Sequence, residues 1–183
     1  MFMAWLVLAV ACICLLYEGY RHLKKTGYLK MLSVDDMNPL LANLIEPPLF
    51  KAIRNDDYDG VKFQIVNKGV DVNLRNERGD TALIIAACEG RTHIGLFLLR
   101  SHADYNAQEK YGNTALHEAV LWKHKQFVKM LLDYFPRTDI KNAGGNTALM
   151  LAEQEKDPET GMWKDKDMEE IAFMIREMEK ECG

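Results

Sequence analysis

Three stretches of the sequence share one pattern: GDTALIIAACEG at 79–90, GNTALHEAVLWK at 112–123 and GNTALMLAEQEK at 145–156. Their starting glycines are evenly spaced along the chain (112 − 79 and 145 − 112 both give 33). Self-similarity at a fixed period of roughly 20 to 50 residues is the signature of a protein built from stacked supersecondary units. The period therefore predicts a repeat architecture.

The chemistry of one copy predicts a pair of helices. The opening glycine suits a tight turn with positive φ, and the threonine two positions later suits a helix N-cap. Leucine and alanine then recur at helical spacing. In the third copy an apolar stripe marks a second helix, formed by Phe127, Val128, Met130, Leu131 and Leu132. Such a pair cannot bury its own apolar faces, so we expect neighbouring copies to stack around a continuous core.

These copies resemble the ankyrin repeat, whose pattern is G-x-T-P-L-H-x-A-A-x-x-G followed by a second helix. The closest agreement is TALH at 114–117, and alanine replaces the proline of the pattern at Ala82, Ala115 and Ala148. The resemblance spans about residues 47–180. It implies an all-α solenoid of about four repeats, each a helix-turn-helix pair with a β-turn tip. An apolar run near the start of the chain predicts a hydrophobic helix before this solenoid.

The ends of the repeat region depart from the pattern. The first copy, PPLFKAIRNDD at 47–57, lies one position further from the second than the period requires (83 − 49 gives 34), which predicts an insertion near Asp57–Gly60. Asn38 and Pro39 predict a short capping helix, and the last copy predicts a C-terminal helix over Lys166–Glu181. The expected organisation is an apolar helix at 1–20, a linker at 21–37 and a repeat domain at 38–183, with repeats at 47–78, 79–111, 112–144 and 145–181 and an insertion at 157–165.

An unbroken apolar run, FMAWLVLAVACICLLY, extends from Phe2 to Tyr17. It is shorter than a typical transmembrane helix of about 20 residues, so a membrane anchor, a cleaved signal peptide and a buried helix all remain open. The run favours an anchor. Arg21, Lys24 and Lys25 follow it and no basic residue precedes it, which predicts a single-pass protein with its repeats in the cytoplasm. A signal peptide would instead place them in the periplasm or outside the cell.

Composition argues against several other functions. From Thr26 onward there are 20 basic and 26 acidic side chains (23 − 3 and 27 − 1), an excess of negative charge that phosphate would repel, so nucleic acid is not an expected partner. The four cysteines show no metal or disulfide spacing, and no nucleotide-binding or hydrolase motif is present. We therefore expect no enzyme activity, catalytic residue, cofactor, metal or small-molecule substrate. His117 and Cys88 have structural interpretations.

The resemblance implies that a partner protein binds the concave face formed by the turn tips and the first helices. Tyr111 and Trp122 lie at variable positions, where exposed aromatic side chains carry much of the binding energy, although Trp122 could instead pack against a neighbouring repeat. The predicted partner-binding residues are Arg54, Asn55, Glu77, Arg78, Asp80, Cys88, Glu89, Lys110, Tyr111, Asn113, Leu121, Trp122, Asn146, Gln154 and Glu155.

Two functions from different classes fit these features. The first is a membrane-tethered adaptor that presents its concave face to a partner of unknown identity. The second is an immunity or inhibitor protein that neutralises a toxic enzyme, exported if the N-terminus is a signal peptide; the acidic body would suit a basic toxin. An enzyme, the third class, would need a deep polar pocket with perturbed titrating groups.

Overall fold

A threonine fixes the start of the first helix in each of the three well-matched repeats. Thr81, Thr114 and Thr147 are the N-cap residues, and each hydroxyl accepts a hydrogen bond from a backbone N–H in the first turn. A cap of this kind stabilises a helix by about 1 kcal/mol. The glycines just upstream of these caps have φ of 77° to 79°, as the turn chemistry predicts.

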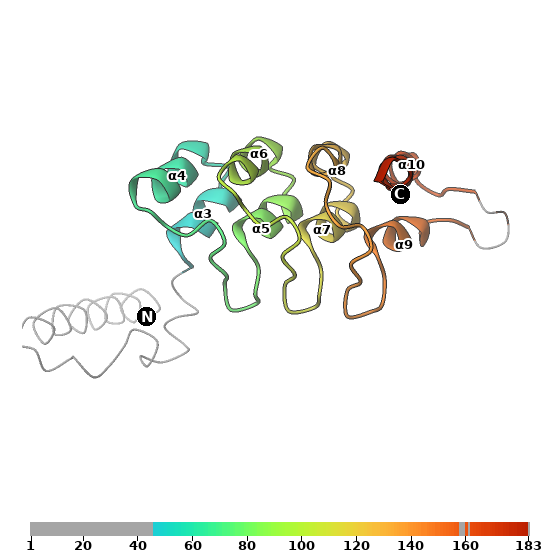
Figure 1. The fold of residues 1–183 in the computed structure, drawn as a ribbon, viewed down its shortest axis with the longest axis horizontal. Helices are drawn as coiled ribbons and strands as arrows, with labels where there is room; N and C mark the ends of the chain where they lie inside the picture. The colour runs from blue at the N-terminus through green and yellow to red at the C-terminus, as the bar shows by residue number, and fades with distance from the viewer. Residues whose placement is uncertain (1–45, 158–159, 161, 183) are drawn as a thin grey trace, which may run out of the picture. The chain divides into compact units, whose positions relative to one another are not determined.

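The computed structural model describes residues 46–157, 160 and 162–182. Pro47 onward forms one unit, and its regular elements within the described residues are all helices, joined by turns and without a β-strand. Figure 1 shows two layers in this unit, with the first helix of each repeat in one and the second helix in the other. The helices are α3 (Pro48–Arg54), α4 (Tyr58–Lys62), a π-helical turn η2 (Phe63–Asn67), α5 (Ala82–Cys88), α6 (Thr92–Arg100), α7 (Ala115–Leu121), α8 (Lys125–Leu132), α9 (Ala148–Glu153) and α10 (Lys166–Cys182).

The core runs through the unit from repeat to repeat. Ala86, Ala119 and Ala152 are fully buried in α5, α7 and α9, and α7 contacts both α5 and α9. A small side chain at this position lets neighbouring first helices approach closely. Phe50 in α3 and Phe127 in α8 are the largest fully buried side chains. The stacked core predicted from the period is confirmed for the described residues.

The insertion of the first repeat, predicted near Asp57–Gly60, lies between two turns that bracket this segment. Asp56 and Gly90 occupy the same turn in successive repeats, with φ of 59° and 67°, and Gly69 and His102 occupy the next turn, with φ of 67° and 66°. The first repeat is longer by one position between these two turns (69 − 56 against 102 − 90). The π-helical turn Phe63–Asn67 lies in this interval and absorbs the difference, because an i→i+5 turn accommodates more backbone than an α-helical turn.

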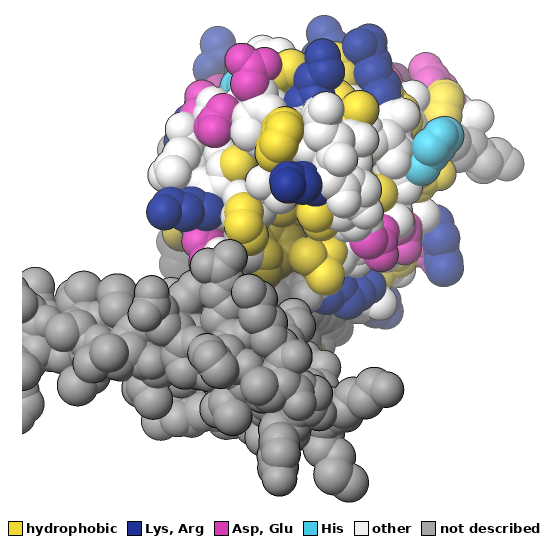
Figure 2. Space-filling model, turned by 90° about the vertical axis from the view of Figure 1, so that its left-hand side faces the viewer, with side chains coloured by type: hydrophobic (Ala, Val, Ile, Leu, Met, Phe, Trp, Pro, Cys, Tyr) yellow, Lys and Arg dark blue, Asp and Glu magenta, His cyan; other side chains and the backbone are white. Residues whose placement is uncertain are grey.

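The leading end of the stack carries exposed apolar side chains. Figure 2 looks at this end, where hydrophobic side chains are visible among basic and acidic ones. Tyr58, Phe63 and Val66, all from α4 and the π-helical turn, are exposed. The Lys68 ammonium lies 5.6 Å from the centre of the Phe63 ring.

The insertion of the last repeat forms a short paired loop between α9 and α10. Lys156 and Trp163 form an antiparallel bridge, and the Lys156 ammonium lies 4.6 Å from the Trp163 ring centre. Lysines of the third repeat hold this region. Lys123 Nζ lies 2.7 Å from Asp165 Oδ2, and Lys125 Nζ lies 2.7 Å from Glu170 Oε2. The helix predicted at Lys166–Glu181 is observed as α10.

Hydrogen bonds that repeat with the sequence period connect the turn tips. Arg75 Nη1 donates to the Gln108 carbonyl, and Gln108 Nε2 donates to the Lys141 carbonyl, so each side chain reaches its equivalent in the next repeat. The Lys110 N–H donates to the Arg78 carbonyl at 3.0 Å. The tips therefore form one connected row, visible in Figure 1 beyond the layer of first helices.

The predicted apolar helix at 1–20, the linker at 21–37 and the capping helix at Asn38–Pro39 lie outside the described residues. Among the helices that the structure does describe, none combines the length and hydropathy needed to cross a membrane.

Alanine substitutions at two glycines with the same φ test how closely the tips pack. A Cβ at Gly112 would lie 2.9 Å from the Ala143 backbone nitrogen, whereas a Cβ at Gly145 meets nothing within 4 Å, and both glycines have φ of 77°. We expect Gly145→Ala to lower the free energy of unfolding by about 1–2 kcal/mol through φ alone. Gly112→Ala should lower the free energy of unfolding by about 1–3 kcal/mol more than Gly145→Ala does, because the backbone at Ala143 must move to make room for the new Cβ. Urea denaturation of the full chain measures both, and equal losses would contradict the close approach.

Candidate functional site

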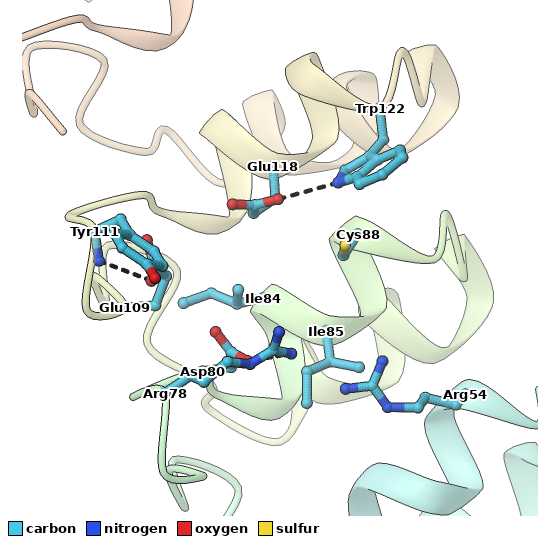
Figure 3. Close-up of a pocket in the computed structure, with 10 residues that line it drawn as sticks. All are labelled: Arg54, Arg78, Asp80, Ile84, Ile85, Cys88, Glu109, Tyr111, Glu118 and Trp122. Atoms are coloured by element: carbon cyan, nitrogen blue, oxygen red, sulfur yellow. Dashed lines mark hydrogen bonds and ion pairs between the residues drawn. The ribbon is translucent and has the colours of Figure 1, made fainter. Parts of the chain in front are cut away.

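A hollow of about 230 Å³ lies on the side of the first helices and turn tips, between the second and third repeats. Its floor comes from α5 and its far wall from α7, and the tips of both repeats close one end (Figure 3). The side chains that line it are Arg54, Arg78, Asp80, Ile84, Ile85, Cys88, Glu109, Tyr111, Glu118 and Trp122.

Two exposed aromatic side chains stand at the hollow. Tyr111 is 64% exposed on the tip of the third repeat, and Trp122, the C-cap residue of α7, is 58% exposed. Trp122 does not pack down against a neighbouring repeat, the alternative left open by the sequence. Its indole Nε1 instead donates to Glu118 Oε2 at 3.2 Å, one turn earlier on the same helix. Exposed Trp and Tyr beside a hollow are the side chains that most often anchor protein interfaces.

Glu118 lies between the two aromatic side chains in Figure 3. Besides the indole, its carboxylate accepts a hydrogen bond from Asn113 Nδ2 at 2.9 Å. Burial raises the pKa of Glu118, the negative charges of Glu109 and Asp80 raise it further, and the two hydrogen bonds oppose the rise. The folded protein therefore holds this carboxylate in an environment that disfavours its charge.

Glu109 is a buried carboxylate that shapes the tip of the third repeat. Its Oε2 accepts from the Tyr111 N–H at 2.8 Å and its Oε1 from the Asn113 N–H at 3.0 Å. At the equivalent positions one repeat before and after, the neutral side-chain oxygens of Asn76 and Asn142 each accept the same pair of backbone hydrogen bonds. The glutamate therefore fulfils the structural role of asparagine and adds a negative charge to the hollow.

The two arginines of the hollow are engaged with other acids. Arg78 Nη2 lies 3.0 Å from Asp80 Oδ2, and Arg54 Nη1 lies 3.3 Å from Glu89 Oε1. Within the described residues, neither Glu109 nor Glu118 forms an ion pair. Two carboxylates in the hollow are thus satisfied by neutral donors alone.

Cys88 faces this hollow from the end of α5. Burial raises the pKa of its thiol to about 11, and the negative charges of Glu118 and Glu89 add to the effect. A thiol with this pKa remains protonated near neutral pH, so it is a poor nucleophile and a poor metal ligand. Among the described residues no group of His, Cys, Asp and Glu is arranged to hold a metal ion.

His117 is buried and links two repeats. Its Nδ1 accepts from the Thr114 N–H at 3.3 Å, which leaves Nε2 to donate to the Asn146 carbonyl at 3.1 Å. Burial lowers the pKa of His117. The structure therefore agrees with the structural interpretation of this histidine, which stays neutral while it joins α7 to the tip of the fourth repeat.

The structure brings together six of the side chains predicted to bind a partner, and it adds four that the sequence did not single out. Ile84, Ile85, Glu109 and Glu118 were missed because the family's variable positions do not mark them. Asp80 is buried rather than freely exposed. The predicted residues that line the hollow are Arg54, Arg78, Asp80, Cys88, Tyr111 and Trp122.

The remaining predicted residues lie around the hollow or beyond it. Asn55 follows α3, Glu77 and Lys110 are exposed on tips, and Leu121 is exposed at the end of α7. Glu89 and Asn113 bind Arg54 and Glu118 respectively. Those of the fourth repeat lie further along the stack: Gln154 donates to Asn146, and Glu155 lies 4.0 Å from Lys123.

Comparison with known proteins places this fold in a family. The family described as "Ankyrin repeats (3 copies)" matches residues 49–142. The chain therefore belongs to the ankyrin repeat family, whose repeats are protein–protein interaction modules and whose members are typically non-enzymatic scaffolds.

Individual relatives share the repeats within much longer chains. The chain is 33% identical over 115 residues to the rat protein "Ankyrin repeat and SAM domain-containing protein 6", covering 62% of this chain and 13% of that one. It is 32% identical over 110 residues to human "Neurogenic locus notch homolog protein 1", covering 60% and 4%. Human "Transient receptor potential cation channel subfamily A member 1" is 29% identical over 139 residues, covering 71% and 12%. The matched part is less than a fifth of each relative.

The raised pKa of Glu118 predicts how its charge affects stability. As pH rises above the ordinary glutamate value of 4.5, the unfolded chain releases this proton before the folded chain does, so wild-type stability falls through that window. Glu118→Gln has no proton to lose. We expect the free energy of unfolding of wild type, relative to Glu118→Gln, to decrease as pH rises from about 4 towards neutrality.

Urea denaturation of the full chain at a series of pH values provides the measurement. Glu169→Gln, at an exposed carboxylate on α10, controls for the loss of one negative charge. If wild type instead became more stable relative to Glu118→Gln as pH rises, the raised pKa of Glu118 would be contradicted.

Proposed function

We propose that this chain is a non-enzymatic adaptor that binds a partner protein on the concave face of its repeats, and that its apolar N-terminal segment tethers it to a membrane. The observation that carries the proposal is the pair of exposed aromatic side chains, Tyr111 and Trp122, at a hollow built by two adjacent repeats. Leu121, which is exposed and precedes Trp122 in the sequence, adds apolar area.

The surroundings of these aromatic side chains favour binding over a role in stability. Tyr111 and Trp122 expose most of their surface, so desolvating them against a partner would contribute favourable free energy that folding has not already used. The tip that carries Tyr111 is held to the next tip by a backbone hydrogen bond, which the Ala143 N–H donates to the Tyr111 carbonyl at 2.8 Å. A surface held in place before binding loses less conformational entropy in the complex.

The tether rests on the apolar run Phe2–Tyr17 and the basic residues that follow it. The positive-inside rule favours an orientation with the repeats in the cytoplasm. A tether of this kind confines the repeats to the membrane surface and raises the effective concentration of any partner found there.

Co-purification from detergent-solubilised membranes tests the binding face. Trp122→Ala and Tyr111→Ala should each weaken capture of a partner by about tenfold or more, since losses of about 2 kcal/mol are typical of interface hot spots. Tyr111→Ala should keep the wild-type free energy of unfolding to within about 0.5 kcal/mol, because the side chain is exposed. Trp122→Ala also removes the hydrogen bond to Glu118 and should lower it by about 1 kcal/mol.

The matched control is Phe173→Ala, which removes an aromatic side chain that is 62% exposed on α10, in the layer of second helices. It should capture the same partners as wild type. The proposed binding face would be refuted if Trp122→Ala and Tyr111→Ala both captured every partner as wild type does. It would also be refuted if Phe173→Ala reduced capture as much as they do.

Protease treatment of intact cells tests the tether and its orientation. We expect the repeats to remain in the membrane fraction, to resist protease added outside, and to be digested once the membrane is permeabilised. A chain shortened to residues 21–183 should leave the membrane fraction. Digestion of the repeats from outside would overturn the cytoplasmic orientation, and an unchanged distribution of the shortened chain would overturn the tether.

A further inference from the structure

The hollow between the second and third repeats has a charge imbalance that the repeats themselves reveal. Because the copies are in register, each lining position has equivalents that show what the fold requires there. The position of Asp80 is occupied by Asn113 and Asn146 in the following copies. The position of Glu109 is occupied by Asn76 and Asn142 in the neighbouring copies. The position of Glu118 is occupied by Ile85 and Leu151. At each of these three positions, the other two well-matched copies carry a neutral side chain. The acidic side chains at these positions all face one hollow.

The acids of this hollow differ in how their charge is compensated. Asp80 is paired with Arg78 at 3.0 Å. Glu109 and Glu118 accept only neutral hydrogen bonds within the described residues, from two backbone N–H groups in one case and from Asn113 and Trp122 in the other. A partly desolvated carboxylate that is not paired with a cation is unfavourable, as the raised pKa of Glu118 reflects. Arg54 and Arg78 also line the hollow, but they are paired with Glu89 and Asp80. A further positive charge would therefore complement Glu109 and Glu118.

The aromatic side chains determine which cation fits best. In Figure 3 the Trp122 indole lies beside Glu118 and the Tyr111 ring beside Glu109, and Ile84, Ile85 and Cys88 also line the hollow. A planar guanidinium stacks on aromatic faces, is only weakly hydrated and donates several hydrogen bonds to carboxylates at once. An ammonium is a strongly hydrated point charge, so it would lose more hydration on entering this hollow and could not stack on the aromatic rings as a planar group does.

From this charge complementarity we propose that the hollow is a receptor for an arginine side chain of the partner protein, with the guanidinium bound by Glu118 and Glu109 and stacked against Trp122. This proposal rests on the proposed function, because it assumes that the partner uses the concave face. It specifies the partner segment chemically: one arginine, presented by a stretch whose flanking side chains are apolar enough to cover Tyr111 and Leu121.

The test uses the full chain in detergent and a display library of short random peptides as the probe. Peptides selected on wild type are sequenced, and their affinities are measured by fluorescence anisotropy. We expect an arginine to recur in the selected peptides. Glu118→Gln should weaken them by about tenfold or more, in line with measured couplings of close interfacial charge pairs. Glu169→Gln, which removes the same charge from exposed α10, should change affinity less than about twofold.

A double-mutant cycle separates a direct contact from a general change in the protein. Replacing the recurrent arginine of a selected peptide with glutamine should weaken binding to wild type but should weaken binding to Glu118→Gln far less, because the partner of the arginine is then already absent. If Glu118→Gln acted only by altering the structure of the protein, replacing the peptide arginine would weaken binding to wild type and to Glu118→Gln by the same factor.

The possible outcomes distinguish this proposal from the proposed function. Peptides whose binding depends on Trp122 but which lack arginine, or whose arginine shows no coupling to Glu118, would overturn the arginine receptor and leave the binding face intact. A library in which no selected peptide depends on Trp122 or Tyr111 would overturn both.

Discussion

Close stacking of the first helices is the constraint on which the rest of the molecule depends. Ala86, Ala119 and Ala152 are fully buried where α5, α7 and α9 meet, and a larger side chain there would push the repeats apart. This spacing sets the distance between turn tips, so that Arg75 and Gln108 can each reach the carbonyl one repeat further on. It also sets the width of the hollow between α5 and α7. The candidate site therefore follows from the packing of the core.

The hollow is distinguished from the rest of the stack by side chains that the fold does not require. The tip of the third repeat would be held as well by asparagine as by Glu109, as its neighbours Asn76 and Asn142 show. A hydrophobic side chain could occupy the position of Glu118, as Ile85 and Leu151 do. Trp122 stands where the second and fourth repeats carry Glu89 and Glu155. Each of these choices leaves apolar surface exposed or a negative charge without a paired cation, and the proposed partner would cover the one and neutralise the other.

Some of this structure was predictable from the sequence, for physical reasons. The capping threonines and the positive-φ glycines act within a single turn of the chain, so their local chemistry already predicts them. The insertion in the first repeat was predictable from the spacing of the copies, but its absorption by the π-helical turn at Phe63–Asn67 was not. An extra residue can be absorbed in a turn or in a helix, and only packing decides which. The exposure of Trp122 depends on the space left by the neighbouring repeat, which no local pattern reveals. Glu109 and Glu118 lie outside the family's variable positions, so only a comparison of the copies with one another marks them.

The most direct test of the binding face is a photo-crosslinking amino acid introduced at single positions of the full chain in living cells. Placed at Tyr111, on the tip beside the hollow, it should form a covalent adduct with a partner protein upon illumination. Placed at Phe173, equally exposed but on α10 in the other helix layer, it should not. Adducts from position 173 and none from position 111 would contradict the assignment of the concave face as the site of binding.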